Sequence, residues 1–380
     1  MNLLKKKLRT LMVTDRKGRL SYLESFLFVL SFAYAAAVKL RAIGYQSGIL
    51  TSKRLPCKVI SVGNITVGGT GKTPMTVYLA RLLHQLGHRI AVISRGYRGD
   101  AEKTGGIVSN GREILLGFQS AGDEPVMMAK QLKDLEIPLL VGQNRYRIGL
   151  LAVKEFKPDV IILDDGFQHL NLVRDINLVL LDSRRPFGNK HLLPRGPLRE
   201  TLSSLSRGDA FIMTRSDPTS IDADIASLDE LKATLSGRPI FSCSHVPYVY
   251  QVIKGSGDAT ESFAKRPLSL EFESIKGRRA FAFSGIARND DFRRTVERFE
   301  CDMKGFIDFP DHHRYLDNDL NTLYCAARDT DAEILLTTEK DYTRLDHGIH
   351  WPMDLVIIGI KISFGRDEND FSTFIKGRLE

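Results

Sequence analysis

A glycine-rich stretch between residues 61 and 74 carries residue types and a spacing that suit the binding of phosphate groups. It reads SVGNITVGGTGKTP, after an apolar run at 59–62 and before apolar positions at helical spacing in 77–83. Strand, glycine loop and helix in this order are the context of a phosphate-binding P-loop. Glycines let successive backbone N–H groups turn toward one centre, and the helix N-terminus adds positive potential there. The stretch therefore predicts a site for the phosphates of a nucleotide.

Two side chains of this loop have the chemistry that a bound nucleotide requires. Lys72 would reach the β- and γ-phosphates, and the hydroxyl of Thr73 would bind Mg²⁺. The common pattern has a glycine where this chain has Thr66, so an ordinary glycine turn is the alternative interpretation. The predicted nucleotide loop comprises Thr66, Val67, Gly68, Gly69, Thr70, Gly71, Lys72 and Thr73.

Two adjacent carboxylates, Asp164 and Asp165, follow the apolar run at 160–163. In P-loop proteins an aspartate at the end of a neighbouring strand holds Mg²⁺ or its bound water. Carboxylate oxygens suit this ion, although an aspartate in such a place can also cap a helix or form a turn. Because neighbouring side chains point in different directions, we expect one of the two to contact the metal shell.

An acid in the segment GDEP at 122–125, Asp123, could accept the proton of an attacking hydroxyl group. A carboxylate is a weak base, and a partner that steers or relays the proton would help it. The segment DHH at 311–313 offers such a partner in His312, although each segment could also be a surface turn or cap. A metal site at 311–313 is disfavoured because adjacent histidines rarely aim at one ion.

Further loops carry charged residues that could contact an anionic ligand. Arg95 follows the predicted strand at 88–94, at the same sheet edge as the glycine loop if that strand is parallel. The Gly/Pro loop at 187–200 contains Arg195 and Arg199, and arginine pairs well with phosphate. A solvated loop is the alternative for 187–200. The segment TTEKD at 337–341 could close over the nucleotide or begin a turn.

The composition is that of a folded protein of one to three domains, with two the natural estimate for 380 residues. Hydrophobic residues make up 43% and charged residues 26% of the chain, with no low-complexity tract. The four cysteines are far apart and form no C-x-x-C pair, so a disulfide framework or zinc ribbon is disfavoured. A reducing compartment is the default expectation.

The net charge of +8 comes from the N-terminal arm, because residues 1–60 hold twelve Lys or Arg and two acids. Within the arm, residues 25–38 are uncharged and largely apolar, which is short of the about twenty residues that cross a bilayer. We therefore expect a helix that lies in a membrane interface. The alternatives are a helix buried in the protein, and a signal peptide or a true membrane span. Binding of nucleic acid by the basic arm is disfavoured, because few aromatic residues interleave with its charges. Deleting residues 1–40 is expected to release the protein from membranes while leaving activity on detergent-dispersed substrate.

Strand-like and helix-like segments alternate along the chain, which predicts an α/β layered fold. Apolar runs such as 160–163 and 178–181 are typical of parallel strands covered on both faces. The expected strands are 88–94, 138–142, 159–164, 176–182 and 209–214, with helices at 74–87, 123–134, 144–156 and 198–206. The alternating run at 245–253 predicts an exposed antiparallel ribbon within a linker near 240–275. A second α/β unit follows, with strands at 279–283, 333–337 and 355–361 and helices at 289–299 and 317–328.

As a set, these segments closely resemble the tetraacyldisaccharide 4′-kinases of lipid A biosynthesis. The motifs are VGN at 62–64, GGTGKTP at 68–74, SRGY at 94–97, GDEP at 122–125, LDDGFQH at 163–169, GN at 188–189, LPRGPLRE at 193–200, FSGI at 283–286, DHH at 311–313 and TTEKD at 337–341. The resemblance implies an ATP-dependent kinase at the cytoplasmic face of the inner membrane, with Mg²⁺ as cofactor. Its substrate would be the 4′-hydroxyl of a tetraacylated glucosamine disaccharide 1-phosphate. We also expect a monomer that binds no nucleic acid.

The resemblance assigns roles and an architecture to this chain. Asp123 looks like the catalytic base with His312 as its partner, and Asp165 looks like the acid associated with Mg²⁺. The other implied site residues are Thr66–Thr73 and Glu200 for the nucleotide, and Asn64, Arg95 and Arg199 for the substrate. Two α/β/α domains joined by a β-ribbon are implied, divided into a membrane-associating arm (1–50), a P-loop kinase domain (51–240), a linker ribbon (241–275) and a closing domain (276–380). Charged residues at 190–191 and a tail beyond about 345 depart from the family pattern.

Two other classes of protein remain as alternatives. A membrane-associated P-loop ATPase or GTPase switch is suggested by TRSD at 214–217, which faintly resembles a guanine-reading element, with Arg215 where Lys is usual. Nucleotide turnover that prefers GTP and is indifferent to lipid would favour the switch. A non-catalytic lipid-binding scaffold would keep its function after Lys72→Ala.

Overall fold

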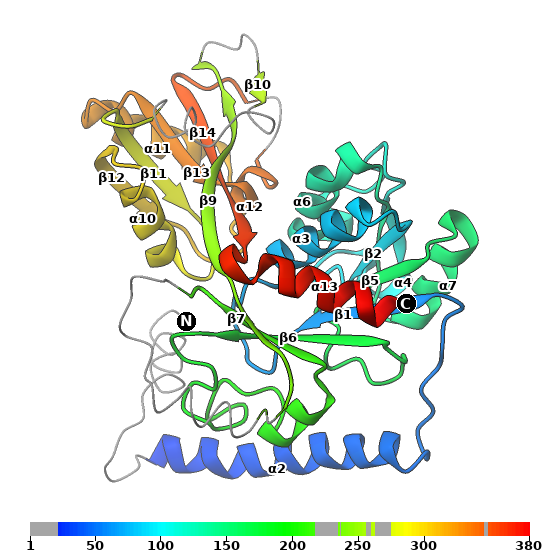
Figure 1. The fold of residues 1–380 in the computed structure, drawn as a ribbon. Helices are drawn as coiled ribbons and strands as arrows, with labels where there is room; N and C mark the ends of the chain where they lie inside the picture. The colour runs from blue at the N-terminus through cyan, green and yellow to red at the C-terminus, as the bar shows by residue number, and fades with distance from the viewer. Residues whose placement is uncertain (1–21, 217–234, 236, 256–259, 263–274, 346–348) are drawn as a thin grey trace.

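The computed structural model describes residues 22–216, 235, 237–255, 260–262, 275–345 and 349–380 (Figure 1). Two β-sheets, each covered by helices on both faces, form two lobes. We call the sheet β1–β8 with its helices the first lobe and the sheet β9–β14 with its helices the second lobe. The α/β/α architecture expected from the sequence is confirmed.

The first sheet, within the described residues, has eight strands in the order β3-β4-β2-β5-β1-β6-β7-β8. The strands are β1 (Lys58–Gly63), β2 (Ile90–Ser94), β3 (Gly106–Ser109), β4 (Leu139–Val141), β5 (Val160–Asp164), β6 (Ile176–Asp182), β7 (Ala210–Thr214) and β8 (Ile240–Ser242). All neighbours pair in parallel except β3 with β4. Because β2, β5 and β1 are parallel neighbours, their carboxyl ends meet at one edge, where ligands of such sheets bind.

Helices cover both faces of this sheet because its strands are apolar on both faces. They are α3 (Lys72–Gln85), α4 (Ala101–Thr104), α5 (Phe118–Ala121), α6 (Asp123–Leu132), α7 (Arg145–Phe156) and the 3₁₀ helices η1 (Lys133–Leu135) and η2 (Leu202–Arg207). Residues of α3 and α6 pack with Ile60 and Val62 on one face. Residues of α7 pack with Val59 and Leu163 on the other face. Alternate residues of β1 thus belong to different cores.

The second sheet, in the described part of the chain, has six strands in the order β10-β9-β14-β13-β11-β12. The elements of this lobe are β9 (Ser244–Ile253), β10 (Thr260–Ser262), β11 (Arg279–Ser284), α10 (Asn289–Glu297), β12 (Asp302–Asp308), α11 (Asp317–Asp329), β13 (Ile334–Thr338), α12 (Glu339–Tyr342) and β14 (Asp354–Ser363). Phe292 of α10 packs in the core on one face, and Leu323 of α11 packs in the core on the other.

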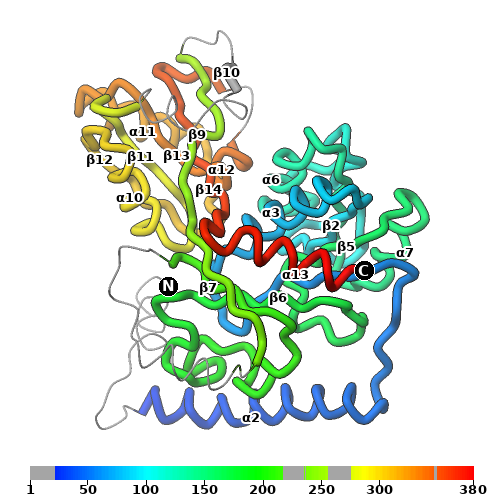
Figure 2. The backbone as a smooth tube through the Cα atoms, in the orientation of Figure 1, coloured from blue at the N-terminus to red at the C-terminus, as the bar shows by residue number. Residues whose placement is uncertain are grey.

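The chain passes between the lobes on two adjacent strands. β9 pairs antiparallel with β14 along its length, from Ser244 opposite Ser363 to Ile253 opposite Leu355. The expected antiparallel strand at 245–253 is confirmed, but its expected exposure is wrong, because β9 lies between β10 and β14 and all its residues are buried or half-buried. After η4 (Gly365–Asp367), helix α13 (Glu368–Leu379) returns to the first lobe (Figure 2). Phe371 and Ile375 of α13 are buried in the core beside α3. The segment beyond residue 345 therefore contributes to both lobes.

One expected helix is wrong. Residues 198–201 are not helical, and the 3₁₀ helix η2 begins only at Leu202. The reason is a tertiary contact, because Leu198 forms an antiparallel bridge with Thr66 of the glycine loop. The expected strands of both lobes are present, while β3, β8, β10 and β12 were not anticipated.

The N-terminal helix α2 (Tyr22–Gln46) lies along the outside of the first lobe (Figure 1). It extends beyond the uncharged run 25–38, and its 25 residues are long and apolar enough to cross a membrane by length and composition. Glu24, Leu27 and Ser31 face the lobe and are buried, whereas Phe26 is 61% and Phe32 63% exposed. The helix is thus a surface helix rather than the buried helix considered as an alternative. The basic residues before Tyr22 lie outside the described residues.

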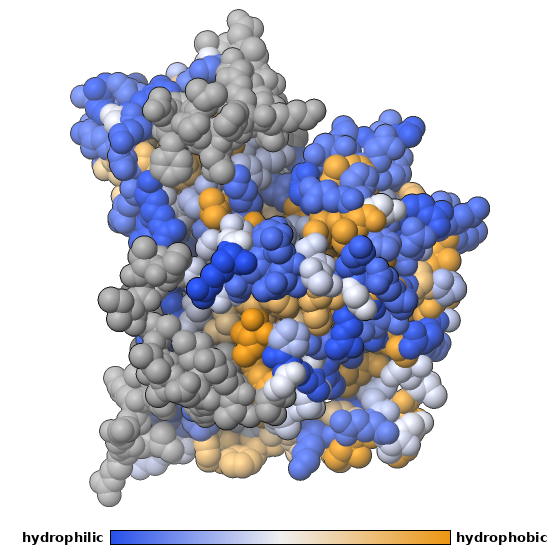
Figure 3. Space-filling view, viewed as in Figure 1, coloured by the Kyte–Doolittle hydropathy of each residue, from blue (hydrophilic) through white to orange (hydrophobic). Residues whose placement is uncertain are grey.

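The surface around α2 mixes two kinds of side chain. Figure 3 shows hydrophobic surface along the lower edge of the molecule, where α2 lies, with hydrophilic side chains between. Val29 and Leu40 are among the exposed apolar residues of the helix, and Lys39 and Arg41 are exposed on it as well. The exposed surface of the helix therefore combines apolar and basic groups.

Candidate active site

The glycine loop connects the end of β1 to the start of α3. Gly71 precedes the helix with φ 86°, and Gly68 has φ 115°, both in the region that favours glycine. A Cβ atom at Gly71 would clash with the ring of His245, so the close approach of β9 also requires glycine there. The loop therefore presents backbone N–H groups at the start of a 14-residue helix, which is the arrangement that binds phosphate.

Asn64 and Lys72 fix the interior of this loop. The Nδ2 group of Asn64 donates to Thr70 Oγ1 at 2.9 Å, and Lys72 Nζ donates to Asn64 Oδ1 at 3.3 Å. Lys72 Nζ also lies 3.6 Å from Asp165 Oδ1. Asn64 is fully buried, so its side chain contacts the loop rather than the open cavity. The lysine is held at the loop by an amide and a carboxylate.

Asp164 and Asp165 point in different directions, as expected. Asp164 is buried at the end of β5 and accepts hydrogen bonds from Thr76 Oγ1 at 3.3 Å and Ser94 Oγ at 3.0 Å. Burial, with the nearby charges of Glu124 and Asp165, raises the pKa of Asp164 to about 6.

Asp165 has a left-handed backbone, with φ 52°. Nη1 of Arg199 donates to both oxygens of its carboxylate, to Oδ1 at 3.1 Å and to Oδ2 at 2.9 Å. Burial opposes its ionisation, but the charges of Lys72 and Arg199 outweigh burial and lower the pKa of Asp165. Asp165 is thus a stable carboxylate between two cations.

Asp123 joins the two lobes. It begins α6 in the first lobe, is 7% exposed, and its Oδ2 atom lies 3.0 Å from Nδ1 of His312 in the second lobe. Arg344 of the second lobe donates to the same oxygen from Nε at 2.9 Å and from Nη2 at 2.5 Å, and Lys340 Nζ lies 3.8 Å away. Burial opposes ionisation of Asp123, but the hydrogen bond from His312 and the charges of Lys340 and Arg344 lower its pKa.

Arg344 holds this junction together from inside. Its side chain is 3% exposed, and Nη1 donates to the carbonyl of Gly285 at 2.9 Å and to Asp341 Oδ1 at 3.1 Å. His312 has a left-handed φ of 62°, and its backbone N–H donates to the same Gly285 carbonyl at 3.1 Å. Arg344 and His312 are therefore positioned by one turn and converge on one carboxylate.

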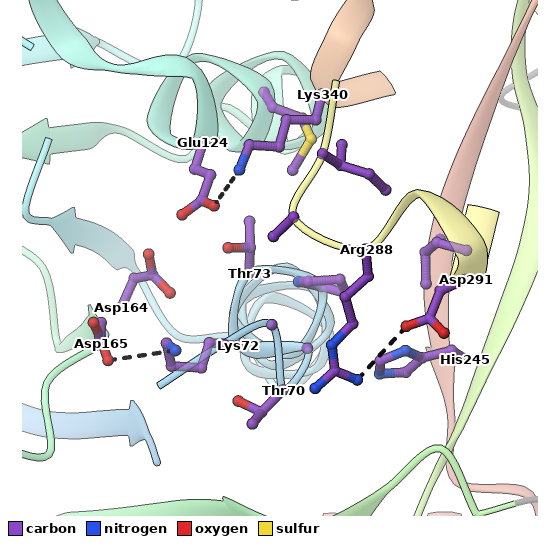
Figure 4. Close-up of a pocket in the computed structure, with 18 of the residues that line it drawn as sticks. Thr70, Lys72, Thr73, Glu124, Asp164, Asp165, His245, Arg288, Asp291 and Lys340 are labelled. Atoms are coloured by element: carbon purple, nitrogen blue, oxygen red, sulfur yellow. Dashed lines mark hydrogen bonds and ion pairs between the residues drawn. The ribbon is translucent and has the colours of Figure 1, made fainter. Parts of the chain in front are cut away.

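A cavity of about 1510 Å³ lies between the lobes and includes both the glycine loop and Asp123. It is larger than the roughly 300–1,000 Å³ of common small-molecule sites, so it has room for more than one ligand. Figure 4 shows Lys72, Thr73 and Asp164 along one side and Arg288, Asp291 and Lys340 on the elements of the second lobe. Tyr34 and Arg41 of α2 also line this cavity, which thus extends from the glycine loop to the N-terminal helix.

The predicted site residues fall into two groups. On the cavity wall lie Gly68, Gly69, Thr70, Gly71, Lys72, Thr73, Arg95, Asp123, Asp165, Arg199 and His312. Thr66, Val67 and Asn64 are not among the lining residues, and Arg95 pairs with Glu102 at 2.6 Å. Glu200 is buried behind Arg199 and forms an ion pair with Arg207. The structure brings the first group together without bringing Glu200 to the cavity.

Several charged residues of the site were not anticipated from the sequence. Arg215, after β7, donates to the carbonyl of Gly69 at 2.5 Å and pairs with Asp182. Arg288 of the second lobe lies 3.4 Å from Asp182 and 3.6 Å from Asp291, and it lines the cavity near Gly68. In the sequence, Arg215 belongs only to the segment 214–217, which faintly resembles a guanine-reading element. Asp217 of that segment lies outside the described residues. No local pattern marks Arg288 or Arg344.

A metal ion bound here would need ligands from outside the protein. Among the residues that the structure describes, no group of three or more His, Cys, Asp or Glu side chains could hold a metal ion. The Thr73 hydroxyl and the carboxylates of Asp164 and Asp165 all reach the cavity wall. Mg²⁺ typically uses one or two carboxylates together with substrate phosphates and water, so this set of donors fits it.

Comparison with known proteins gives one consistent result. A family model described as tetraacyldisaccharide-1-P 4′-kinase matches residues 23–380. The chain is 38% identical over 381 residues to the tetraacyldisaccharide 4′-kinase of Desulfatibacillum aliphaticivorans, covering 100% of this chain and 99% of that relative. It is 43% identical over 323 residues to the protein of the same name from Syntrophus aciditrophicus, covering 83% of each.

Solved structures agree with this result. The crystal structure of LpxK from Aquifex aeolicus in complex with ATP superposes with a TM-score of 0.73 at 31% sequence identity. The match covers 94% of this chain and 100% of that one. The similarity therefore extends over both lobes.

Proposed function

The chain belongs to the tetraacyldisaccharide-1-P 4′-kinase family, and from that premise we propose how its residues transfer phosphate from ATP to the 4′-hydroxyl of a lipid disaccharide. The resemblance drawn from the motifs is confirmed at the level of the family, and the switch is not favoured. The observation that carries the mechanism is that the glycine loop and the Asp123–His312 pair line one cavity. That geometry suits a donor phosphate and an acceptor hydroxyl held side by side.

The nucleotide would bind with its phosphates over the loop 68–73. Backbone N–H groups at the start of α3 and the Lys72 ammonium supply the positive potential that a triphosphate needs. Lys72 rests on Asn64 and Asp165 at 3.3 and 3.6 Å, so it can shift to a phosphate without leaving the loop. Arg288, from the second lobe, would add a further positive charge once the lobes close on the nucleotide.

Mg²⁺ is the second part of the proposal. Thr73 and Asp165, as expected from the sequence, are its proposed protein ligands, with Asp164 beside them. When bound, the ion would neutralise charge on the transferring phosphoryl group. Arg199, which holds Asp165, would set the direction of that carboxylate.

Asp123 is the proposed acceptor of the hydroxyl proton. Burial raises the pKa of Asp123, but the hydrogen bond from His312 and the charges of Lys340 and Arg344 lower it by more. Asp123 is therefore ionised at neutral pH and is a weak base. A weak base suffices when phosphoryl transfer passes through a loose transition state, because the attacking oxygen gives up its proton late. His312 would then hold the carboxylate in place through the 3.0 Å contact of Nδ1.

The acceptor lipid is proposed to enter from the side of α2. Tyr34 and Arg41 of this helix line the cavity, while its opposite face exposes apolar residues such as Phe26 and Phe32. A helix with its apolar face in lipid and basic residues near the headgroups would lie in the interface. We further propose that the protein acts as a monomer and that it does so on the cytoplasmic face of the inner membrane, where ATP is present. A spanning α2 would lose the contacts of its inner face with the first lobe.

The test of the proposed function is transfer of label from γ-labelled ATP to a tetraacylated disaccharide 1-phosphate by the full chain. We expect label in the lipid fraction for the wild-type protein and none for Lys72→Ala. Label appearing only as free phosphate, at a rate indifferent to the lipid and higher with GTP, would contradict the proposal. Removal of Mg²⁺ by a chelator should stop transfer without unfolding the protein.

A further inference from the structure

The loop 187–200 touches α2 on one side and the glycine loop on the other. We propose that α2 is a positioning element of the active site: Ser31 and Tyr34 on its inner face hold the loop 191–199, and this loop holds the phosphate-binding loop and Asp165. The inference rests on the kinase function proposed above and adds a role for α2 beyond membrane attachment. It concerns residues of α2 that are not among the nucleotide and metal residues proposed above.

The contacts on the helix side are specific hydrogen bonds. Ser31, 7% exposed, accepts from the backbone N–H of Arg195 at 3.0 Å, and its hydroxyl lies 2.9 Å from the carbonyl of Leu192, to which it can donate. Tyr34 donates its hydroxyl to the carbonyl of Arg199 at 2.9 Å. One turn earlier, the ring of Phe28 packs edge-on against His191 with ring centroids 5.6 Å apart. The inner face of α2 therefore holds the loop at both ends.

The contacts on the other side are made by the backbone of the glycine loop. The N–H of Val67 donates to the carbonyl of Pro197 at 2.8 Å, and the N–H of Arg199 donates to the carbonyl of Ile65 at 2.7 Å. Between these two bonds, Thr66 and Leu198 form an antiparallel bridge. The loop 187–200 thus acts as a short edge strand for the segment that begins the phosphate site.

Arg199 is the residue on which these contacts converge. Its N–H is bound to Ile65, its carbonyl to Tyr34, and its side chain to both oxygens of Asp165. Asp165 in turn lies 3.6 Å from Lys72 Nζ. A displacement of α2 would therefore move the main chain of Arg199, and with it the carboxylate that faces Lys72.

The outer face of α2 has no part in these bonds, so the two faces have separate tasks. Contact of the outer face with lipid would fix the position of the helix. The hydrogen bonds of the inner face would then fix the position of the loop relative to the helix. This changes the expectation for a protein lacking residues 1–40. Such a protein would lose Ser31 and Tyr34, so its kcat should fall even on detergent-dispersed substrate.

The test compares Tyr34→Phe with Tyr22→Phe, a matched change at the 98% exposed start of the same helix. Both are assayed as full chains with detergent-dispersed tetraacylated disaccharide, where attachment to a membrane is irrelevant. We expect Tyr34→Phe to lower kcat about 3- to 10-fold, the factor for a typical hydrogen bond, and to lower the melting temperature by no more than about a few degrees. Tyr22→Phe should match the wild type.

A double-mutant cycle distinguishes positioning from general weakening. If Tyr34 acts through Arg199, Tyr34→Phe should add no further loss in an Arg199→Met background, because coupled residues are not additive. Wild-type kcat for Tyr34→Phe, or an additive loss in the cycle, would overturn the inference. Absence of lipid labelling by the wild-type protein would instead contradict the proposed function, so the two failures can be told apart.

Discussion

Replacing Arg344 by methionine should separate the two lobes at the active site. Arg344 makes two bonds to Asp123 of the first lobe and one each to Gly285 and Asp341 of its own lobe, and it is 3% exposed. Methionine has a similar length but no donor. The substitution leaves Asp123 and Asp341 as buried carboxylates with one fewer cation, and the Gly285 carbonyl with one fewer donor.

The magnitude follows from the burial of this pair. Removing one partner of a buried ion pair costs about 3–5 kcal/mol. Part of this free energy holds Asp123 beside His312, and losing it should raise the activation barrier. Each 1.36 kcal/mol added to the barrier lowers the rate about tenfold. We therefore expect kcat to fall about 10²- to 10³-fold. Arg344→Lys keeps the charge but not the forked geometry, so its loss should be smaller.

The assay is steady-state transfer at saturating ATP, accompanied by thermal unfolding and by the Kd for ATP. The Kd should change little, because Arg344 contacts Asp123 and not the glycine loop. Asp123→Asn removes one of the two buried carboxylates that lost a cation, so the double variant Arg344→Met/Asp123→Asn should melt at a higher temperature than Arg344→Met alone. Near-normal kcat in Arg344→Met with an unchanged melting temperature would refute the view that this contact assembles the site.

Three further outcomes are expected. Asp123→Asn should lower kcat about 10²- to 10⁴-fold, the range for general base catalysis, with the Kd for ATP little changed; near-normal turnover would remove Asp123 from that role. His312→Ala should lower kcat without changing the Kd for ATP, and a change confined to that Kd would contradict its placement beside the acceptor. Glu339 is buried, accepts from Gln131 at 2.6 Å, and has Oε1 without a hydrogen-bond partner among the described residues; burial raises its pKa to about 8. The folded state then keeps a proton that the unfolded state, with a pKa of about 4.3, has lost, so stability should fall as pH rises from about 5 to 8. Glu339→Gln cannot titrate, so urea unfolding at pH 5 and 9 should show a smaller loss for the variant than for the wild type; equal losses would exclude Glu339 as the cause.

The elements that one continuous segment specifies could be predicted from the sequence. The glycine loop, β5 with its terminal carboxylates and the antiparallel strand at 245–253 are each marked by local spacing or alternation. The uncharged run 25–38 predicted too short a helix, because Lys39 and Arg41 lie on the exposed side of α2 and do not interrupt it. Charged side chains on a solvated face are compatible with a helix.

The rest of the site depends on contacts between distant segments. Arg344 and Asp123 are 221 residues apart, and neither shows a pattern that announces the other. The helix expected at 198–206 is absent at its start because Leu198 and Arg199 bind to the backbone at 65–67 instead. Local preference was overridden there by a strand-like pairing that only the assembled lobe provides.

The antiparallel pair β9 and β14 also determines how the second lobe can move. The chain leaves the first lobe at Ser244 and comes back opposite it at Ser363, so residues 244–363 form an insert whose two ends are neighbours. The two strands are hydrogen-bonded along their length, so the two ends of the insert are held together. A hinge motion at this pair would carry the second lobe as one unit, so His312 and Arg344 would approach Asp123 together.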